Sequence, residues 1–414
     1  MEKVITLLAA IFVFSLCNPA KATLDAPPVV WEKTFGGSSR DEGWSVQQTT
    51  DGGFVIAGGT SSFGAGGDDV YLIKTDSEGN LLWEKTFGGS SWDSAHSVQQ
   101  TTDGGFIIAG YTGSFGAGND DVYLIKTDPN GEMLWQNTFG GSKWDYGYSV
   151  QQTTDGGFII AGDTSSFSAW PYSDVYLIKT DSVGNMQWQK TFGGSHFDFG
   201  WSVQQTADGG YIIAGDTKSF GGAPFREDLY LIKTDTNGNL LWQKTFIVSL
   251  SWAAVQQTTD GGYIIVAGST LIKTDTNGNL LWQKTFGGFS RGFSCGSSIQ
   301  QTTDGGFIIS GDTSSFGADP DYTDVYLVKT DSAGNLLWQK TFSGSSYDRG
   351  RSVQQTTDGG FIIAGTTYSF GAGYGDVYLI KVGFEGCERW DFNCDRCVDF
   401  FDFAEFANHW LEEK

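Results

Sequence analysis

The sequence is short of charged residues, and above all of basic ones. Charged residues make up 18% of the 414 residues, and 25 lysines and arginines stand against 48 aspartates and glutamates, for a formal net charge of −23. Nucleic acids and anionic membranes are bound through clusters of cationic side chains, and the sequence has no such cluster. We therefore expect no nucleic-acid partner, whereas the acidity favours solubility and cation binding.

Long apolar runs are also missing, apart from one near the start. Residues 4–16 form a short apolar run after Lys3, and Ala20-Lys21-Ala22 follows with the small-x-small pattern of a signal-peptidase site. The run is too short to span a bilayer. We expect a signal peptide over residues 1–22, a secreted or cell-surface location and no membrane insertion. Leu16 directly before Cys17 matches a lipid-attachment site poorly, which makes a lipid anchor the weaker alternative.

Histidine and cysteine are too few to indicate a catalytic or zinc motif. None of His96, His196 and His409 lies in a recognisable nucleophile motif. Cys394 and Cys397 have C-x-x-C spacing but lack a second pair for zinc. Export would permit a disulfide among Cys387, Cys394 and Cys397, and the spacing leaves the pairing open.

What the sequence has in abundance is a repeat. The segment Trp-Glu-Lys-Thr-Phe-Gly-Gly recurs with variation seven times, beginning at Trp31, Trp83, Trp135, Trp188, Trp242, Trp282 and Trp338. A period of about 40 to 50 residues with several strands per repeat is typical of propeller blades. Glycine (59 residues) and aromatic residues (15%) suit short strands and tight turns. The sequence predicts an all-β, seven-bladed β-propeller.

Each repeat unit predicts four antiparallel strands. In the first unit, residues 45–48 alternate polar and apolar side chains and lead through Asp51-Gly52 into the apolar run 54–58, which indicates a hairpin. Residues 70–74 and 81–87 supply a third and a fourth strand. Four such strands make one propeller blade.

The two ends of the repeat region complement one another. The last unit stops after its third strand at residues 377–381, whereas residues 31–35 form a surplus fourth strand at the start. We expect this N-terminal strand to close the ring in the last blade, which removes two open sheet edges. The fifth unit lacks the long loop between Gly268 and Leu271, so we expect a truncated blade there. A six-bladed ring with one collapsed unit is the alternative.

The strand order resembles that of WD-repeat propellers, and the repeat is similar to those of secreted bacterial and archaeal propeller proteins. That resemblance covers about residues 29–382 and implies the fold far more than an activity. We expect three segments along the chain, namely a signal peptide (1–22), the propeller (23–382) and a C-terminal module (383–414).

The long loops after the second and fourth strands should emerge on one face of the disc, where propeller ligands usually bind. Residues repeated in nearly every blade lie in these loops; they are Phe63, Phe115, Phe167, Phe220, Phe316 and Phe370, and Asp41, Asp93, Asp145, Asp198 and Asp348. Such repetition favours a structural role, with the aspartates capping turns. Aromatic residues that break the pattern are the candidate ligand face, namely Trp92, Trp144, Trp170, Tyr172 and Trp201. They could stack on sugars or pack between blades.

The segment 39–45, Ser-Arg-Asp-Glu-Gly-Trp-Ser, resembles in part the Asp box of sialidases. This resemblance implies a glycosidase as the enzymatic alternative. Glycosidases need two positioned carboxylates, and an acidic chain contains too many aspartates and glutamates to single out a pair.

The C-terminal segment has the spacing of an EF-hand calcium loop. Oxygen-bearing side chains occupy positions 1, 3, 5, 9 and 12, and a backbone carbonyl serves position 7; these residues are Asp391, Asn393, Asp395, Asp399, Asp402 and Cys397. Apolar residues at three- and four-residue intervals predict a following helix. The segment resembles a single type I dockerin repeat, with Arg396 in place of the usual glycine. We expect it to bind calcium and a cohesin-like or surface partner; an acidic amphipathic tail is the alternative.

Together these features predict a secreted, monomeric, non-catalytic binding or scaffold protein. Its propeller would present loops to an extracellular glycan or surface protein, and its dockerin-like module would attach it to a partner. A polysaccharide-active enzyme and a cell-surface spacer are the alternatives.

Overall fold

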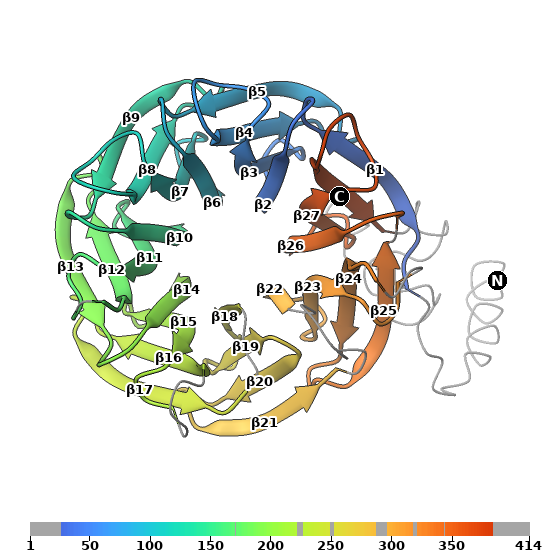
Figure 1. Cartoon of the computed structure of the whole chain (residues 1–414). Coiled ribbons are helices and arrows are strands. Elements are labelled where there is room, and N and C mark those ends of the chain that lie inside the picture. Colours follow the sequence, from blue (N-terminus) through green and yellow to red (C-terminus); the bar gives the residue numbers. More distant parts are fainter. Residues whose placement is uncertain are drawn as a thin grey trace, which may run out of the picture.

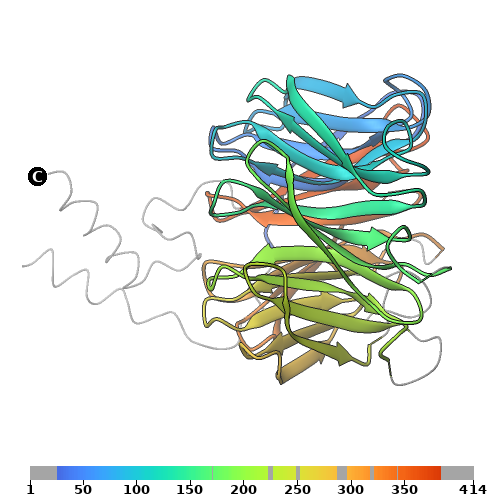
Figure 2. The same cartoon turned by 90° about the vertical axis from the view of Figure 1, so that its left-hand side faces the viewer.

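The computed structural model describes residues 26–383, except for 170, 222–226, 249–251, 287–295, 318–320 and 343. Every regular element among these residues is a strand, and the strands form seven four-stranded antiparallel sheets. The sheets stand radially as blades in a ring (Figure 1), and the ring seen from the side is a disc (Figure 2). The seven-bladed propeller is thereby confirmed. Within this described part of the chain, no helix is long and apolar enough to cross a membrane.

The blades are numbered in chain order, and each contributes one strand to each of four concentric layers. The innermost strands are β2 (Asp41–Gln48), β6 (Asp93–Gln100), β10 (Asp145–Gln152), β14 (Asp198–Gln205), β18 (Ala253–Gln257), β22 (Gly296–Gln301) and β26 (Asp348–Gln355). The second strands are β3 (Phe54–Thr60), β7 (Phe106–Thr112), β11 (Phe158–Thr164), β15 (Tyr211–Thr217), β19 (Tyr263–Ala267), β23 (Phe307–Thr313) and β27 (Phe361–Thr367). The third strands are β4 (Asp69–Thr75), β8 (Asp121–Thr127), β12 (Asp174–Thr180), β16 (Asp228–Thr234), β20 (Thr270–Thr274), β24 (Asp324–Thr330) and β28 (Asp376–Val382). The outermost strands are β5 (Leu81–Phe87), β9 (Met133–Phe139), β13 (Met186–Phe192), β17 (Leu240–Phe246), β21 (Leu280–Thr285), β25 (Leu336–Phe342) and, in blade seven, β1 (Val29–Phe35).

The hydrophobic core lies between neighbouring blades. Between blades one and two, Val55 and Leu72 pack against Phe106 and Tyr123, all of them buried. Because both faces of every blade are covered in this way, the second and third strands are continuous apolar runs without polar alternation.

The tryptophan that opens each repeat joins its blade to the next one. The Trp31 ring lies 5.8 Å from the ring of Phe54, centre to centre. A Cβ atom added at Gly79 would lie 2.8 Å from Trp31 Cη2, and Gly79 also has a φ of 75°. The turn glycine is therefore required both by its backbone conformation and by the indole that packs on it.

The paired glutamines of each repeat bind neighbouring blades in both directions. The Gln47 side-chain carbonyl accepts the Gln100 backbone N–H at 2.5 Å, and the Gln100 side chain accepts the Thr50 backbone N–H at 2.9 Å. The first bond recurs at all seven blade junctions, and so does the second. The first bond satisfies a backbone N–H on the exposed edge of the innermost strand, and the second satisfies one in the turn that follows this strand.

A buried lysine in every third strand pairs with the aspartate of the hairpin turn. In blade one, Lys74 Nζ lies 3.0 Å from Asp51 Oδ2 and donates to the Thr75 carbonyl at 2.9 Å. The same ion pair occurs in all seven blades. Burial disfavours the charge of Asp51, but hydrogen bonds from Thr49, Lys74 and Gly53 outweigh it and lower the pKa of this aspartate.

The ring closes as the sequence predicts. Strand β1 pairs antiparallel with β28, so that Trp31 lies opposite Lys381 and Thr34 opposite Tyr378. Residues from the two ends of the propeller thus share one sheet, of order β1-β28-β27-β26.

Blade five is truncated but complete. Its four strands are shortened to five or six residues, and they still form a sheet of order β18-β19-β20-β21. The six-bladed alternative is therefore wrong. The buried residues Ile265 and Ile272 keep the blade in the shared core, because the missing residues come from the loop and the strand ends.

Candidate functional site: the mouth of the central channel

A β-bulge in six of the seven innermost strands aims one side chain at the channel. In β2 the register with β3 shifts between Gly43 and Ser45, which leaves Trp44 as the extra residue. A Cβ at Gly58, opposite the bulge, would lie 1.7 Å from the Glu42 carbonyl oxygen, so only glycine fits there. The bulged residues are Trp44, His96, Tyr148, Trp201, Ser297 and Arg351.

Blade five also contributes a side chain to the channel mouth, but without a bulge. Strand β18 pairs with β19 without a shift, so it has no bulged residue. Trp252, which directly precedes this strand, lines the channel mouth in its place.

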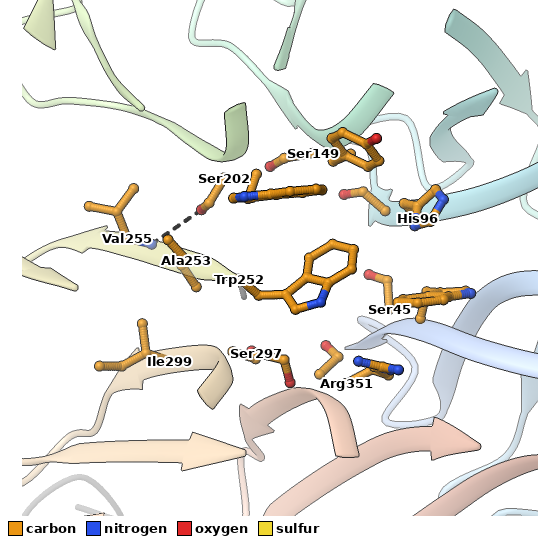
Figure 3. A pocket seen from close by; sticks show the side chains of 17 residues that line it. Ser45, His96, Ser149, Ser202, Trp252, Ala253, Val255, Ser297, Ile299 and Arg351 are labelled. Carbon is orange, nitrogen blue, oxygen red and sulfur yellow. Dashed lines mark hydrogen bonds between the residues drawn. The ribbon is translucent and has the colours of Figure 1, made fainter. Parts of the chain in front are cut away.

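These seven residues surround a cavity of about 210 Å³ at the mouth. Figure 3 shows Trp252 projecting toward the middle of the cavity, with His96 and Arg351 on other sides of it. The ring centres of Trp252 and Trp201 are 4.2 Å apart, and those of Trp201 and Tyr148 are 4.5 Å apart. Trp44 lies 4.8 Å from His96 and 5.8 Å from Trp252, so the rings form a nearly continuous aromatic wall.

A ring of serines lies next to the aromatic wall in the channel. Six serine hydroxyls accept a backbone N–H from the following blade; in one of them Ser45 Oγ accepts the Val98 N–H at 3.2 Å. A hydroxyl that accepts one such bond still has a proton to donate. In blade five Ala254 takes the place of the serine, which makes that side of the ring apolar. Beyond the serines, the channel is lined by the valines and glutamines of the repeat around a second space of about 270 Å³.

Two buried aspartates hold the polar ends of the aromatic side chains. The Trp201 indole N–H donates to Asp216, and the Tyr148 hydroxyl is hydrogen-bonded to Asp163. Burial raises the pKa of both aspartates to about 7. The orientation of these rings is therefore fixed by polar contacts as well as by packing.

Arg351 and His96 come from blades seven and two, on either side of blade one and its Trp44. The guanidinium carbon of Arg351 lies 4.5 Å from the centre of the Trp44 ring, a cation–π contact. Burial, together with the charge of Arg351, lowers the pKa of His96 to about 4. His96 is consequently a neutral imidazole at physiological pH.

The predicted ligand-face residues are divided by the structure. Trp201 belongs to the mouth, whereas Trp92 and Trp144 lie outside its lining with 61% and 43% of their surface exposed. Tyr172 packs on Phe197, 5.1 Å away, also outside the cavity lining. Trp170 lies outside the described residues, as do the predicted signal peptide (residues 1–22) and the predicted calcium-loop residues from Asp391 to Asp402.

The predicted site missed Trp44, His96, Tyr148, Trp252 and Arg351. A signal for all of them except Trp252 exists in the sequence, because the residue before Ser-Val-Gln-Gln changes from blade to blade while its neighbours repeat. This variation indicates a site only once the β-bulge is known, because the bulge turns the variable side chain toward the channel.

The repeated loop residues have the structural role that their repetition indicates. Asp41 accepts the Gly37 N–H at 2.7 Å and the Ser62 hydroxyl at 2.7 Å, which fixes the turn between blades. Phe63 packs on Tyr71 of its own blade at 5.7 Å. In the described ranges, no group of three histidine, cysteine, aspartate or glutamate side chains is placed to hold a metal ion.

No family model matches the chain, and no curated protein sequence matches it either. Solved structures resemble it at low identity. BamB from Moraxella catarrhalis is 14% identical, with 86% of this chain and 88% of that one covered and a TM-score of 0.46. Sqt1 from Chaetomium thermophilum is 12% identical over 87% of each chain, with a TM-score of 0.47. A protein of unknown function from Bacteroides caccae is 14% identical over 70% of this chain and 93% of that one, with a TM-score of 0.42. At these values the likeness says nothing about a ligand or an activity.

Proposed function

We propose that this protein is a secreted, non-catalytic binding protein that holds a saccharide residue in the mouth of its central channel. The observation that carries the proposal is the cavity of about 210 Å³ walled by the rings of Trp44, Tyr148, Trp201 and Trp252. The repeated residues build the blades, whereas the residues that vary between blades converge on this cavity.

The chemistry of the lining suits a sugar. Indole and phenol rings offer flat apolar faces to the C–H face of a pyranose, and the serine hydroxyls and the neutral His96 imidazole offer hydrogen bonds to its hydroxyl groups. A cationic ligand, the other usual occupant of an aromatic cage, is disfavoured here because the Arg351 guanidinium already occupies the face of Trp44.

Attachment to a partner is assigned to the C-terminal segment. Asp391, Asn393, Asp395, Asp399 and Asp402 are hard oxygen donors at EF-hand spacing, and they support a calcium-dependent, dockerin-like module. The apolar run before Ala20-Lys21-Ala22 supports export. In this arrangement the propeller recognises a glycan while the tail joins the protein to a cohesin-like or other surface partner.

A glycan-binding screen of the exported protein, with calcium and with a chelator, tests the proposal. We expect retention of one or more oligosaccharides in both conditions, and calcium-dependent retention of a surface-extract protein. Every mixture is also assayed for newly formed reducing ends. Their appearance would favour the polysaccharide-active enzyme, and retention of no saccharide at all would refute the proposal.

Calorimetry tests the calcium module separately. Calcium titrated into the full chain should release heat at one site, and Asp391→Ala should abolish that heat because it removes the first ligand of the loop. Heat of equal size in the wild type and the variant would place calcium elsewhere.

A further inference from the structure

All arginines of the described residues gather in one sector of the propeller. They are Arg40 of blade one and Arg349 and Arg351 of blade seven, in a protein whose formal net charge is −23. Blades seven and one are neighbours across the closure, since β1 and β28 share a sheet and Arg40 forms an isolated bridge with Gly375. We call this group of three residues the arginine sector.

Two nearby residues are each within electrostatic range of two of the three guanidinium groups. Tyr368 is within electrostatic range of both Arg349 and Arg40, and Asp312 is within range of both Arg349 and Arg351. Arg40 also pairs with Asp68 at 2.7 Å. The sector therefore extends from the loop face, at Arg40, to the cavity, where Arg351 is part of the lining.

The opposite wall of the same cavity is aromatic. Tyr148, Trp201 and Trp252 come from blades three, four and five, which lie across the ring from blades seven and one (Figure 1). Phe199 continues this wall outward, since its ring is stacked on Trp201 at 5.5 Å with an angle of 19° between the planes. The mouth thus combines apolar ring faces with one guanidinium group, that of Arg351, which stacks on Trp44.

We infer that the saccharide held in the mouth is an acidic sugar, whose pyranose ring stacks on Trp201 and Trp252 while its carboxylate is bound by Arg351, with Arg349 of the same strand adding positive charge outside the cavity lining. This inference rests on the proposed function, because it names the class of sugar for the same site. A guanidinium group has five N–H donors in a planar fork that matches a carboxylate, more than one protein partner can use. Stacking on Trp44 fixes the plane of the Arg351 guanidinium group at the cavity lining.

The local charge balance agrees with this assignment. Asp312 is the buried acid beside Arg349 and Arg351, and burial raises its pKa to about 7 even though both arginines act to lower it. Its negative charge is therefore only partly present at neutral pH. The repulsion from the many surface carboxylates is screened over about 10 Å at 0.1 M salt, so it acts weakly on a carboxylate inside the mouth.

Matched pairs of oligosaccharides that differ only in charge test the inference. Calorimetry of the full chain would compare oligogalacturonate, alginate and hyaluronan oligosaccharides with their methyl-esterified forms. We expect at least one acidic form to bind at least tenfold more tightly than its ester. Arg351→Gln should remove that preference, and Arg349→Gln should reduce it. Lys244→Gln, which makes the same change in net charge on outer strand β17, should preserve it.

The outcomes separate this inference from the proposal beneath it. If neutral glycans or the esters bind as tightly as the acidic forms, or if Arg351→Gln leaves the preference intact, the acidic class is wrong and the saccharide site stands. If no saccharide binds, the result refutes both the acidic-sugar inference and the proposed saccharide-binding function. Binding of acetate or sulfate with the same affinity as the oligosaccharide would reduce the sector to a simple anion site and would also overturn the inference.

Discussion

The indole rings of Trp201 and Trp252 lie 4.2 Å apart, centre to centre, although they belong to neighbouring blades that present them by different means. Trp201 is the bulged residue of β14, whereas Trp252 precedes a strand that has no bulge. Where blade five departs from the regular repeat sequence, it therefore still contributes a side chain to the cavity lining.

The first prediction concerns this pair. Trp252→Ala should lower the affinity for the bound saccharide by about tenfold or more, because one stacking ring of a well-packed aromatic wall is removed. Trp92→Ala, at an exposed tryptophan outside the cavity lining, should change it less than twofold. Both affinities are measured by calorimetry after circular dichroism has verified the fold. A larger loss for Trp92→Ala would move the site to the exposed rim.

A second prediction tests the glutamine ring. Gln47→Ala leaves the Gln100 N–H without its side-chain acceptor and should lower the free energy of unfolding by roughly 1–3 kcal/mol. Gln187→Ala, on the exposed outer strand β13, should stay within about 0.5 kcal/mol of the wild type. Denaturant unfolding followed by tryptophan fluorescence compares them. Equal stability of the two variants would mean that the glutamine ring adds nothing to the blade junctions.

A third prediction uses two turn glycines as a matched pair. Gly52 and Gly79 have similar positive φ values of 85° and 75°, but nothing lies within 4 Å of a Cβ at Gly52, whereas a Cβ at Gly79 meets the Trp31 indole at 2.8 Å. Gly52→Ala should cost about 1 kcal/mol from backbone strain alone. Gly79→Ala should cost clearly more, because the indole that joins two blades has to move. The difference in melting temperature is the measurement, and a reversed order would contradict the role given to Trp31.

The fourth prediction is a stability maximum on the acidic side of neutrality. Asp163, Asp216 and Asp312 have pKa values raised to about 7, above the value of about 3.9 in the unfolded chain, so the folded protein binds more protons between pH 4 and pH 7. Stability should therefore fall as the pH rises from about 5 to 8. The turn aspartates paired with lysines, such as Asp51, have lowered pKa values, and the stability that they provide should be lost as the pH falls below about 4.

Asp216→Asn isolates one of these groups. Asparagine can still accept the Trp201 N–H but does not titrate, so the loss of melting temperature between pH 5 and pH 8 should become smaller. Asp181→Asn, an exposed turn residue whose pKa is lowered, makes the same change in charge and should leave that loss as it is in the wild type. An unchanged pH dependence in Asp216→Asn would show that this carboxyl does not carry the effect.

Much of the fold follows from local sequence. The Asp51-Gly52 turn between an alternating and an apolar run requires a hairpin, and the surplus strand around Trp31 has only one open edge to join, at the unit that lacks a fourth strand. The truncation of the fifth blade also follows from the sequence, because comparing the repeat units shows directly that this unit lacks a loop. Whether such a shortened unit still completes a sheet depends on its neighbours, because their apolar faces cover it on both sides.

The site was less accessible from the sequence. Trp92 and Trp144 differ from the residues at equivalent positions of other repeats and were therefore predicted to bind ligand, yet they lie outside the cavity lining. His96 and Arg351 line the cavity, but neither belongs to a recognisable sequence motif. Their importance depends on a one-residue bulge, which turns a side chain from the blade interface into the channel. A pairing register of this kind is not encoded in residue spacing alone.

The sequence by itself thus determined the number of blades, their four-strand order and the closure of the ring, since these depend on short-range turn chemistry and on the period of the repeat. The tertiary structure decided which variable residues meet. Six innermost strands, together with the residue that precedes the seventh, each bring one side chain to the channel mouth, and only the closed ring places Trp201 and Trp252 around one cavity with Arg351.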